Sequence, residues 1–265
     1  MPAVCVTLGL VPGGARAGLR EICGCDEESV QGTDTITAIQ LLDRLLLDLP
    51  GIHFGPGAAA LLSPSDRDRL LAALYVLIYG PRVESTVRCA QCGDPFDLDF
   101  SLQELLASVG PTETTGVAGG PDGLFVLPDG RRFRLPTGED EYAVGHLSPD
   151  EAERQLLARC MVEGDPTVAP EVVQTAMREV APLLDLELEA HCPECGAIQS
   201  IHFDIQAYLL SALRSERGQL AREVHRLATA YGWSLTDIMG LSRSQRRSYV
   251  ALIEADASRS ARWNG

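Results

Sequence analysis

The chain has 265 residues, 45% of them apolar, and a formal net charge of −15, so it can bury one or two hydrophobic cores without disulfides. All 22 basic residues are Arg, which excludes the lysine chemistry of Walker phosphate loops and Schiff-base enzymes. The negative charge also disfavours nucleic acid as a partner, because a phosphate backbone would be repelled.

The longest uncharged apolar run, LLAALYVLIY from Leu70 to Tyr79, is about half the roughly 20 residues of a membrane-spanning helix. No membrane span is therefore expected. The first residues, MPAVCVTLGLVPGGARA, have no basic segment ahead of the apolar stretch and do not predict a secretory signal. We expect a cytoplasmic protein whose eight cysteines stay reduced, and this favours metal binding over disulfides for paired cysteines.

A first repeated unit is predicted at residues 19–110, after an N-terminal arm of residues 1–18. The loop REICGCDE begins it, and apolar residues three and four apart predict two helices, one containing LLDRLL and one from Ser65 to Tyr79. The stretch RVESTVR predicts a strand, CAQCG a tight turn and DPFDLDF a second strand. Ser101 is placed to N-cap the helix that follows.

A second unit is predicted at residues 132–208, after a Gly-, Thr- and Pro-rich flexible linker at residues 111–131. Its loop RLPTGEDE matches REICGCDE in Arg, Gly, Asp and Glu, and LLARCM parallels LLDRLL. A helix from Pro170 to Ala181, strand DLELEA, turn CPECG and strand AIQSIHF follow, with Asp204 as the next N-cap. The sequence thus predicts an α+β, mostly helical fold made by tandem duplication of a helix-helix-strand-knuckle-strand-helix unit.

Residues 209–265 are predicted to form a C-terminal helical extension. Apolar residues at helical spacing predict one long helix that ends at Tyr231, before Gly232, and Ser234 and Ser242 are N-caps for two further helices. From Arg214 onward the chain has nine Arg and five acidic residues. A solvated helix face explains these arginines better than a docking surface for an acidic partner.

The two Cys-x-x-Cys pairs carry the clearest chemical signal. Each lies in a turn between two strands, and Gly93 and Gly196 follow the second cysteine, where the backbone turns back and glycine alone adopts positive φ easily. A structural zinc ion requires four ligands, and each pair supplies two thiolates. We predict one structural Zn²⁺ in a zinc-ribbon-like centre that joins the two units, bound by Cys89, Cys92, Cys192 and Cys195.

The energies permit this arrangement. Closing a loop of about 100 residues costs roughly 4 kcal/mol of chain entropy. Structural zinc contributes on the order of 10 to 16 kcal/mol, so the ion outweighs the closure.

These cysteines also allow other interpretations. A thioredoxin-like redox pair lies at a helix N-terminus, whereas these pairs lie between strands. A catalytic zinc keeps an open position and often uses His, and His191 or His202 could replace a thiolate. Zinc deaminases also require an H-x-E sequence, which the chain lacks. Buried reduced thiols and a metal site shared between molecules remain as alternatives.

The other cysteines and the paired acids have structural explanations. Residues 23–25 (Cys-Gly-Cys) look like half a metal site, but the second unit has Thr-Gly-Glu there, so spare thiols are favoured. Cys5 and Cys160 are expected to be small apolar core residues. The acidic pairs at 26–27 and 140–141 are explained by the helix dipole rather than by acid–base catalysis. No catalytic or cofactor-binding residue is predicted, and no small-molecule substrate.

The stretch EVHRLATAYGWSLTDIMGLSRSQRRSYVALI (Glu223 to Ile253) resembles the C-terminal segment of a protein encoded with phage-tail-like contractile injection systems. Such proteins are similar to the baseplate hub assembly chaperones of contractile-tailed phages. The likeness extends to LREICGCDE, SPSDRDRLLAALYVLIYG and both knuckles, and its most specific part is Trp-Ser-x-x-x-Ile followed by Arg-Arg-x-x-Tyr.

The resemblance implies a non-enzymatic structural or assembly protein of a baseplate, with hub or spike proteins as partners. It implies location in the bacterial cytoplasm and leaves retention in the assembled tail open. Two alternatives belong to other classes. One is a zinc-dependent hydrolase accessory of the same particle, which would need an open metal position and a carboxylate base. The other is an acidic zinc-ribbon adaptor that binds protein or nucleic acid through its Arg-rich tail.

Overall fold

The computed structural model describes residues 2–11, 15–49, 53–110, 116–120 and 122–263. The fold is α+β: helices make up about half of the chain, and the strands form small antiparallel sheets. The first elements are β1 (Val4–Leu8), β2 (Ala15–Leu19), α1 (Gly24–Ser29), α2 (Thr35–Leu45), β3 (Leu46–Leu47), the 3₁₀ helix η1 (Ala58–Leu61), α3 (Pro64–Tyr79), β4 (Arg82–Arg88), β5 (Pro95–Ser101) and α4 (Leu102–Ser108).

A second series of elements begins with β6 (Ala118–Gly119) and β7 (Leu124–Val126). It continues with β8 (Arg132–Arg134), α5 (Gly138–Val144), α6 (Pro149–Cys160), β9 (Met161–Glu163), α7 (Pro170–Val180), β10 (Asp185–His191), β11 (Ile198–Asp204) and α8 (Ile205–Ser215). From β8 to α8 this order follows the order from β2 to α4, apart from η1. The chain then ends in α9 (Arg217–Tyr231), α10 (Leu235–Gly240) and α11 (Arg243–Trp263).

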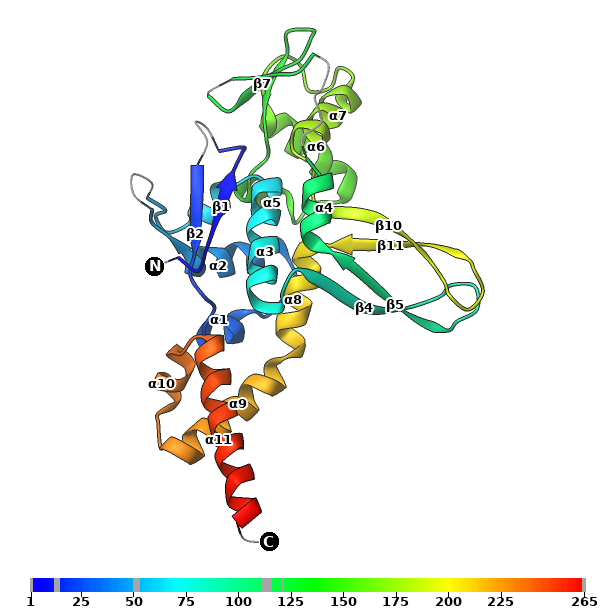
Figure 1. Ribbon diagram of the computed structural model, residues 1–265. Helices are drawn as coiled ribbons and strands as arrows, with labels where there is room; N and C mark the ends of the chain where they lie inside the picture. Colours follow the sequence, from blue (N-terminus) through cyan, green and yellow to red (C-terminus); the bar gives the residue numbers. More distant parts are fainter. Residues whose placement is uncertain (1, 12–14, 50–52, 111–115, 121, 264–265) are drawn as a thin grey trace.

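Two long β-hairpins are the feature that positions the cysteines. β4 pairs with β5 from Arg82↔Ser101 to Arg88↔Pro95, and β10 pairs with β11 over the same number of residues. Figure 1 shows both hairpins reaching away from the helical body side by side, with their turns together at the far end. At their base, the rings of Phe100 and Phe203 meet edge to face with centroids 5.1 Å apart. The paired hairpins therefore start from one shared aromatic contact.

The main core lies between β1, β2, α2, α3 and α8, and it includes residues far apart in the sequence, from Leu8 to Leu213. Leu70, Leu71 and Leu74 of α3 and Leu209, Leu210 and Leu213 of α8 are its central helical residues, all buried. A smaller core forms under the sheet β6-β7-β8-β9 and α7, around Phe133. No helix in the part of the chain that the structure describes has the length and apolarity needed to cross a membrane.

The predicted N-caps are confirmed, but the predicted long helix is wrong. Ser101, Asp204 and Ser234 accept hydrogen bonds from the first turns of α4, α8 and α10. The helix expected to run on to Tyr231 is divided at Glu216 into α8 and α9. The Glu216 carboxylate accepts a hydrogen bond from Tyr79 Oη at 3.0 Å and pairs with Arg243, and Gly218 weakens the helix just beyond it.

Two further expectations are corrected by the structure. Cys5 is exposed because it alternates along β1 with Val4, Val6 and Leu8, which face the core, whereas Cys160 is buried as predicted. Within the predicted linker, residues 118–119 and 124–126 form strands of the four-stranded sheet. Residues 111–115 and 121 of that linker lie outside the described residues.

Candidate metal centre

The turns of the two hairpins bring together the four predicted ligands. All four Sγ atoms lie within 4.8 Å of one another. Cys89 Sγ is 3.6 Å from Cys195 Sγ, and Cys92 Sγ is 3.7 Å from Cys192 Sγ. A tetrahedron with zinc–sulfur bonds of about 2.3 Å has edges of about 3.8 Å. The spacing therefore fits a tetrahedral metal site, and it is far too long for disulfide bonds of about 2.05 Å.

Both turns have the same backbone geometry. Gly93 N donates to Cys89 O at 2.9 Å, and Gly196 N donates to Cys192 O at 2.9 Å. The two glycines have φ of 81° and 73°, the left-handed region that other residues rarely adopt. This confirms the reason predicted for glycine after each Cys-x-x-Cys, and it means that each turn presents its two thiols in the same way.

A small apolar cluster supports the centre from the hairpin side. Cys89 and Cys192, the first cysteine of each turn, are buried against Phe96, with Val87, Ala190, Ala197 and Ile201 around them. The second cysteines, Cys92 and Cys195, are exposed. A hydrogen bond joins the first turn to β11 of the other hairpin, from Ala90 N to the Gln199 side-chain oxygen at 2.8 Å. The centre is thus half enclosed at the end of the paired hairpins.

The electrostatic surroundings shift the pKa values of the Cys89 and Cys92 thiols in opposite directions. Backbone N–H groups of Cys92 and Gln91 point at Cys89 Sγ and lower the pKa of that thiol to about 6. At Cys92 the backbone N–H of Asp94 favours the thiolate, but desolvation and the neighbouring sulfurs outweigh it and raise the pKa to about 12. Four thiolates this close repel one another, so the set requires protons or a shared cation.

The histidines near the second knuckle do not join this group. His202 lies on β11 between Asp185 and Glu187, with its ring nitrogens 3.3 and 3.4 Å from their oxygens. Within the described part of the chain, the four cysteines are the one group of three or more Cys, His, Asp or Glu side chains close enough to share a metal ion. Cys23 and Cys25 are free thiols at the start of α1.

Buried Arg–Asp contacts in the two matching loops were missed by the sequence analysis, which explained the acids by the helix dipole alone. Arg20 donates to both oxygens of Asp26 at 2.6 and 2.8 Å, and Arg134 donates to both oxygens of Asp140 at 2.5 and 2.9 Å. The matching Arg and Asp in both loops were the signal that could have revealed these pairs. They are structural, because each Asp also accepts the backbone N–H at the start of its helix.

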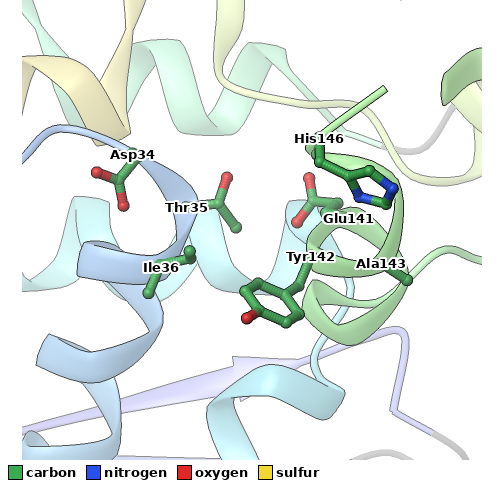
Figure 2. Close-up of a pocket in the computed structure, with 8 residues that line it drawn as sticks. Asp34, Thr35, Ile36, Glu141, Tyr142, Ala143 and His146 are labelled. Atoms are coloured by element: carbon green, nitrogen blue, oxygen red, sulfur yellow. The ribbon is translucent and has the colours of Figure 1, made fainter. Parts of the chain in front are cut away.

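A groove of about 570 Å³ lies apart from the cysteines, between the start of α2 and α5. Figure 2 shows Ile36 on α2 and Tyr142 on α5 on opposite sides of the groove, with Glu141 above Tyr142 on the α5 side. Glu141 is already paired with Arg67, and Asp34 accepts the backbone N–H of Thr37. Both carboxylates at the groove are therefore engaged with groups of the chain itself.

Comparisons of the chain with protein-family models, curated proteins and solved structures find no match.

Proposed function

We propose that the four cysteines hold one structural Zn²⁺ that fastens the two halves of the chain together. The observation that carries this proposal is the near-tetrahedral arrangement of the four sulfur atoms. All four ligands are thiols, and such soft ligands bind zinc in preference to the harder calcium and magnesium ions. The bound ion would neutralise the thiolates and hold the two turns together, since they are far apart in the sequence.

We also propose that the halves are two copies of one ancestral unit. Three features support this: the shared element order, the same backbone bonds in the two knuckles and the same Arg–Asp geometry in the two loops. The zinc centre then lies on the pseudo-two-fold axis that relates the copies, and each copy contributes two of the four ligands. A site built in this way is incomplete in either copy alone.

The protein function that this geometry supports best is non-enzymatic. Four thiol ligands occupy all four coordination positions of a tetrahedral zinc ion and leave none for water or substrate, whereas a zinc hydrolase keeps one position open. The buried side of the centre is apolar, formed by Phe96 and its neighbours, and contributes no general base. The hydrolase alternative is therefore less well supported than a scaffold.

The sequence resemblance supplies the biological setting for this scaffold. We propose a structural or assembly protein of the baseplate of a phage-tail-like contractile injection system, with hub or spike proteins as partners. The helices α9–α11, which carry the most specific part of the resemblance, form a separate group beneath α1 (Figure 1) and present extensive surface to a partner.

Anomalous scattering at the zinc absorption edge tests the metal centre. We expect one zinc ion per chain with four sulfur neighbours at about 2.3 Å. A bound water or a nitrogen ligand would instead support the catalytic alternative. Absence of metal from gently purified protein would reject the centre.

Affinity purification of the tagged full-length protein from its source cells tests the assembly role. We expect hub or spike components to co-purify, and comparison of samples before and after sheath contraction distinguishes a transient chaperone from a retained subunit. Recovery of the free protein alone, with zinc bound, would reject the baseplate role while leaving the metal centre intact. Salt-sensitive retention on DNA would instead favour the adaptor alternative.

A further inference from the structure

The same docking contact occurs twice within this chain. The first turns of α1 (residues 24–27) and α5 (residues 138–141) each contact a segment distant in the sequence. We call these two turns the first and second docking sites. The second site contacts η1 and the start of α3, and the first contacts α10 and the start of α11. The incoming segments share the pattern Leu-Ser-x-Ser-x-Arg, as LSPSDR at residues 62–67 and LSRSQR at residues 241–246. We call residues 60–67 the internal docking segment and residues 239–246 the C-terminal docking segment.

Each docking site has a glycine over which the incoming backbone passes. A Cβ atom on Gly138 would lie 3.2 and 3.3 Å from the O and Cα atoms of Ala60. A Cβ atom on Gly24 would lie 3.1 Å from both the O and Cα atoms of Met239. Ala60 and Met239 occupy the same place relative to the shared sequence, two residues before its Leu. Both sites thus require glycine for the same close backbone approach.

Each docking segment then places an arginine on the glutamate of its site. Arg67 donates to Glu141 at 2.6 Å, and Arg246 donates to Glu27. These arginines hold the same position in LSPSDR and LSRSQR, and both are buried. The helix starts that carry them are capped alike: Ser63 Oγ accepts from Asp66 N at 3.2 Å, and Ser242 Oγ accepts from Gln245 N at 3.3 Å.

Two differences show how the C-terminal contact has been reinforced. Arg243 occupies the place of Pro64, and it adds a second bond to Glu27 at 3.2 Å. Glu223 of α9 also accepts a hydrogen bond from Arg246 Nε, at 3.1 Å. The helix α7 is the counterpart of α3 in the element order. Its start, VAPEVV at residues 168–173, lacks the Ser and Arg of the Leu-Ser-x-Ser-x-Arg pattern. Of the three helix starts, two therefore have the docking chemistry.

We propose that the first docking site also accepts the C-terminal docking segment of a second copy of this chain, so that α9–α11 exchange between copies. These helices leave the body at a single residue, Glu216, where α8 gives way to α9. The contacts that hold them to one another are their own: Arg246 with Glu223, Arg226 with Glu254, and Trp233 against Tyr249 with ring centroids 5.1 Å apart. A hinge at one residue, with an internally braced arm, is the arrangement that domain exchange requires.

The balance between docking within one chain and docking between two chains depends on the effective concentration of the C-terminal docking segment. The docking contacts are the same within one chain and between two chains, so the internal arrangement dominates while the tethered segment has an effective concentration near millimolar. Copies held side by side in an assembly would reach comparable local concentrations. This inference uses only contacts within the chain, so it does not depend on the baseplate proposal.

Two full-length variants separate the arrangements. Gly24→Ala blocks the first docking site by contact with the Met239 backbone but leaves the C-terminal docking segment intact. Arg246→Ala weakens the binding of the C-terminal docking segment but leaves the first docking site intact. Mixed at a concentration where the wild type is monomeric, they should form a one-to-one heterodimer in native mass spectrometry, at about tenfold or more above the dimer of either variant alone.

Controls distinguish this result from unspecific association or unfolding. Arg247→Ala alters the exposed neighbouring arginine and leaves the docking segment intact, so its mixture with Gly24→Ala should stay monomeric. Adding Glu27→Gln to the Arg246→Ala chain should abolish the heterodimer. Hydrogen exchange of α3 and α8 reports whether each variant keeps a folded body, and the double variant Arg243→Ala/Arg246→Ala removes residual docking. Monomers throughout, with folded bodies, would overturn the proposal, as would a heterodimer that persists without Glu27.

Discussion

The Sγ atoms of Cys92 and Cys192 lie 3.7 Å apart although the two residues are 100 positions apart in the sequence. Two hairpins of equal length, joined at their base by Phe100 and Phe203, bring them together. The contact links the two halves at the hairpin ends, so its removal should affect the hairpins before the helical body.

Substitution of one ligand should release the metal and loosen the hairpins. We expect Cys192→Ser to lose zinc and to lower the free energy of unfolding by on the order of 4 kcal/mol or more, because the ion no longer offsets the closure of the long loop. Metal analysis and denaturant unfolding, with and without a chelator, measure this. Cys25→Ser, at an exposed thiol outside the cluster, is the matched control and should keep its zinc.

Placing a side chain on the knuckle glycines should strain the centre without crowding it. Gly93 and Gly196 have positive φ and open space where a Cβ would lie, so replacement by Ala introduces backbone strain alone. We expect each substitution to cost about 1 to 2 kcal/mol and to weaken zinc binding in a competition titration with a chelator. Gly9→Ala, also in open space but without positive φ, should change neither quantity by a comparable amount.

The paired Arg–Asp contacts should stabilise the fold at neutral pH and lose this effect in acid. Burial disfavours the charge of Asp140, but hydrogen bonds from Arg134 and Arg159 prevail and hold the pKa of its carboxyl well below the usual range. A depressed pKa contributes stability that is present above the unfolded value near 4 and is lost as the pH falls further. Asp140→Asn should therefore cost about 2 kcal/mol at pH 7 and less at pH 2 to 3.

Urea unfolding at both pH values measures this difference. Asp150→Asn, at an exposed side chain, should stay within about 0.5 kcal/mol of the wild type. An Asp140→Asn penalty that is equally large in acid would contradict the assignment, because it would not depend on the carboxylate charge.

Asp68 should show the opposite dependence on pH. Burial raises the pKa of its carboxyl to about 7, although the backbone N–H of Leu184 donates to it at 2.9 Å. Folding then disfavours the charged form, and stability falls as the pH rises from about 4 to 7. Asp68→Asn keeps an acceptor for Leu184 and should gain stability relative to the wild type at pH 8, by at most about 4 kcal/mol.

Thermal or urea unfolding at pH 5 and pH 8 tests this reversal. The gain from Asp68→Asn should be about a third as large at pH 5, because the wild-type carboxyl is still protonated in the fold there and only the unfolded chain has lost its proton. Equal gains at both pH values would mean that the substitution acts through packing or hydrogen bonding instead of charge.

Local rules predicted much of the secondary structure and the four cysteines that cluster at the hairpin ends. The knuckle glycines, the N-caps Ser101 and Asp204 and the hairpin strands depend on neighbours within a few residues, and all are found as expected. The four cysteines were identified because zinc chemistry requires four ligands and each turn offered two.

Distant contacts decided the rest. The break at Glu216 depends on Tyr79 and Arg243, which no local helical pattern reveals. Arg243 and Arg246, expected on a solvated face, are buried against Glu27 because the extension folds back onto α1. The sequence by itself determined which residues turn, which residues cap helices and where the two cysteine pairs lie, since those properties are local. Only the tertiary structure determined which charges meet, because the pairing of buried ions depends on how segments far apart in the chain pack together.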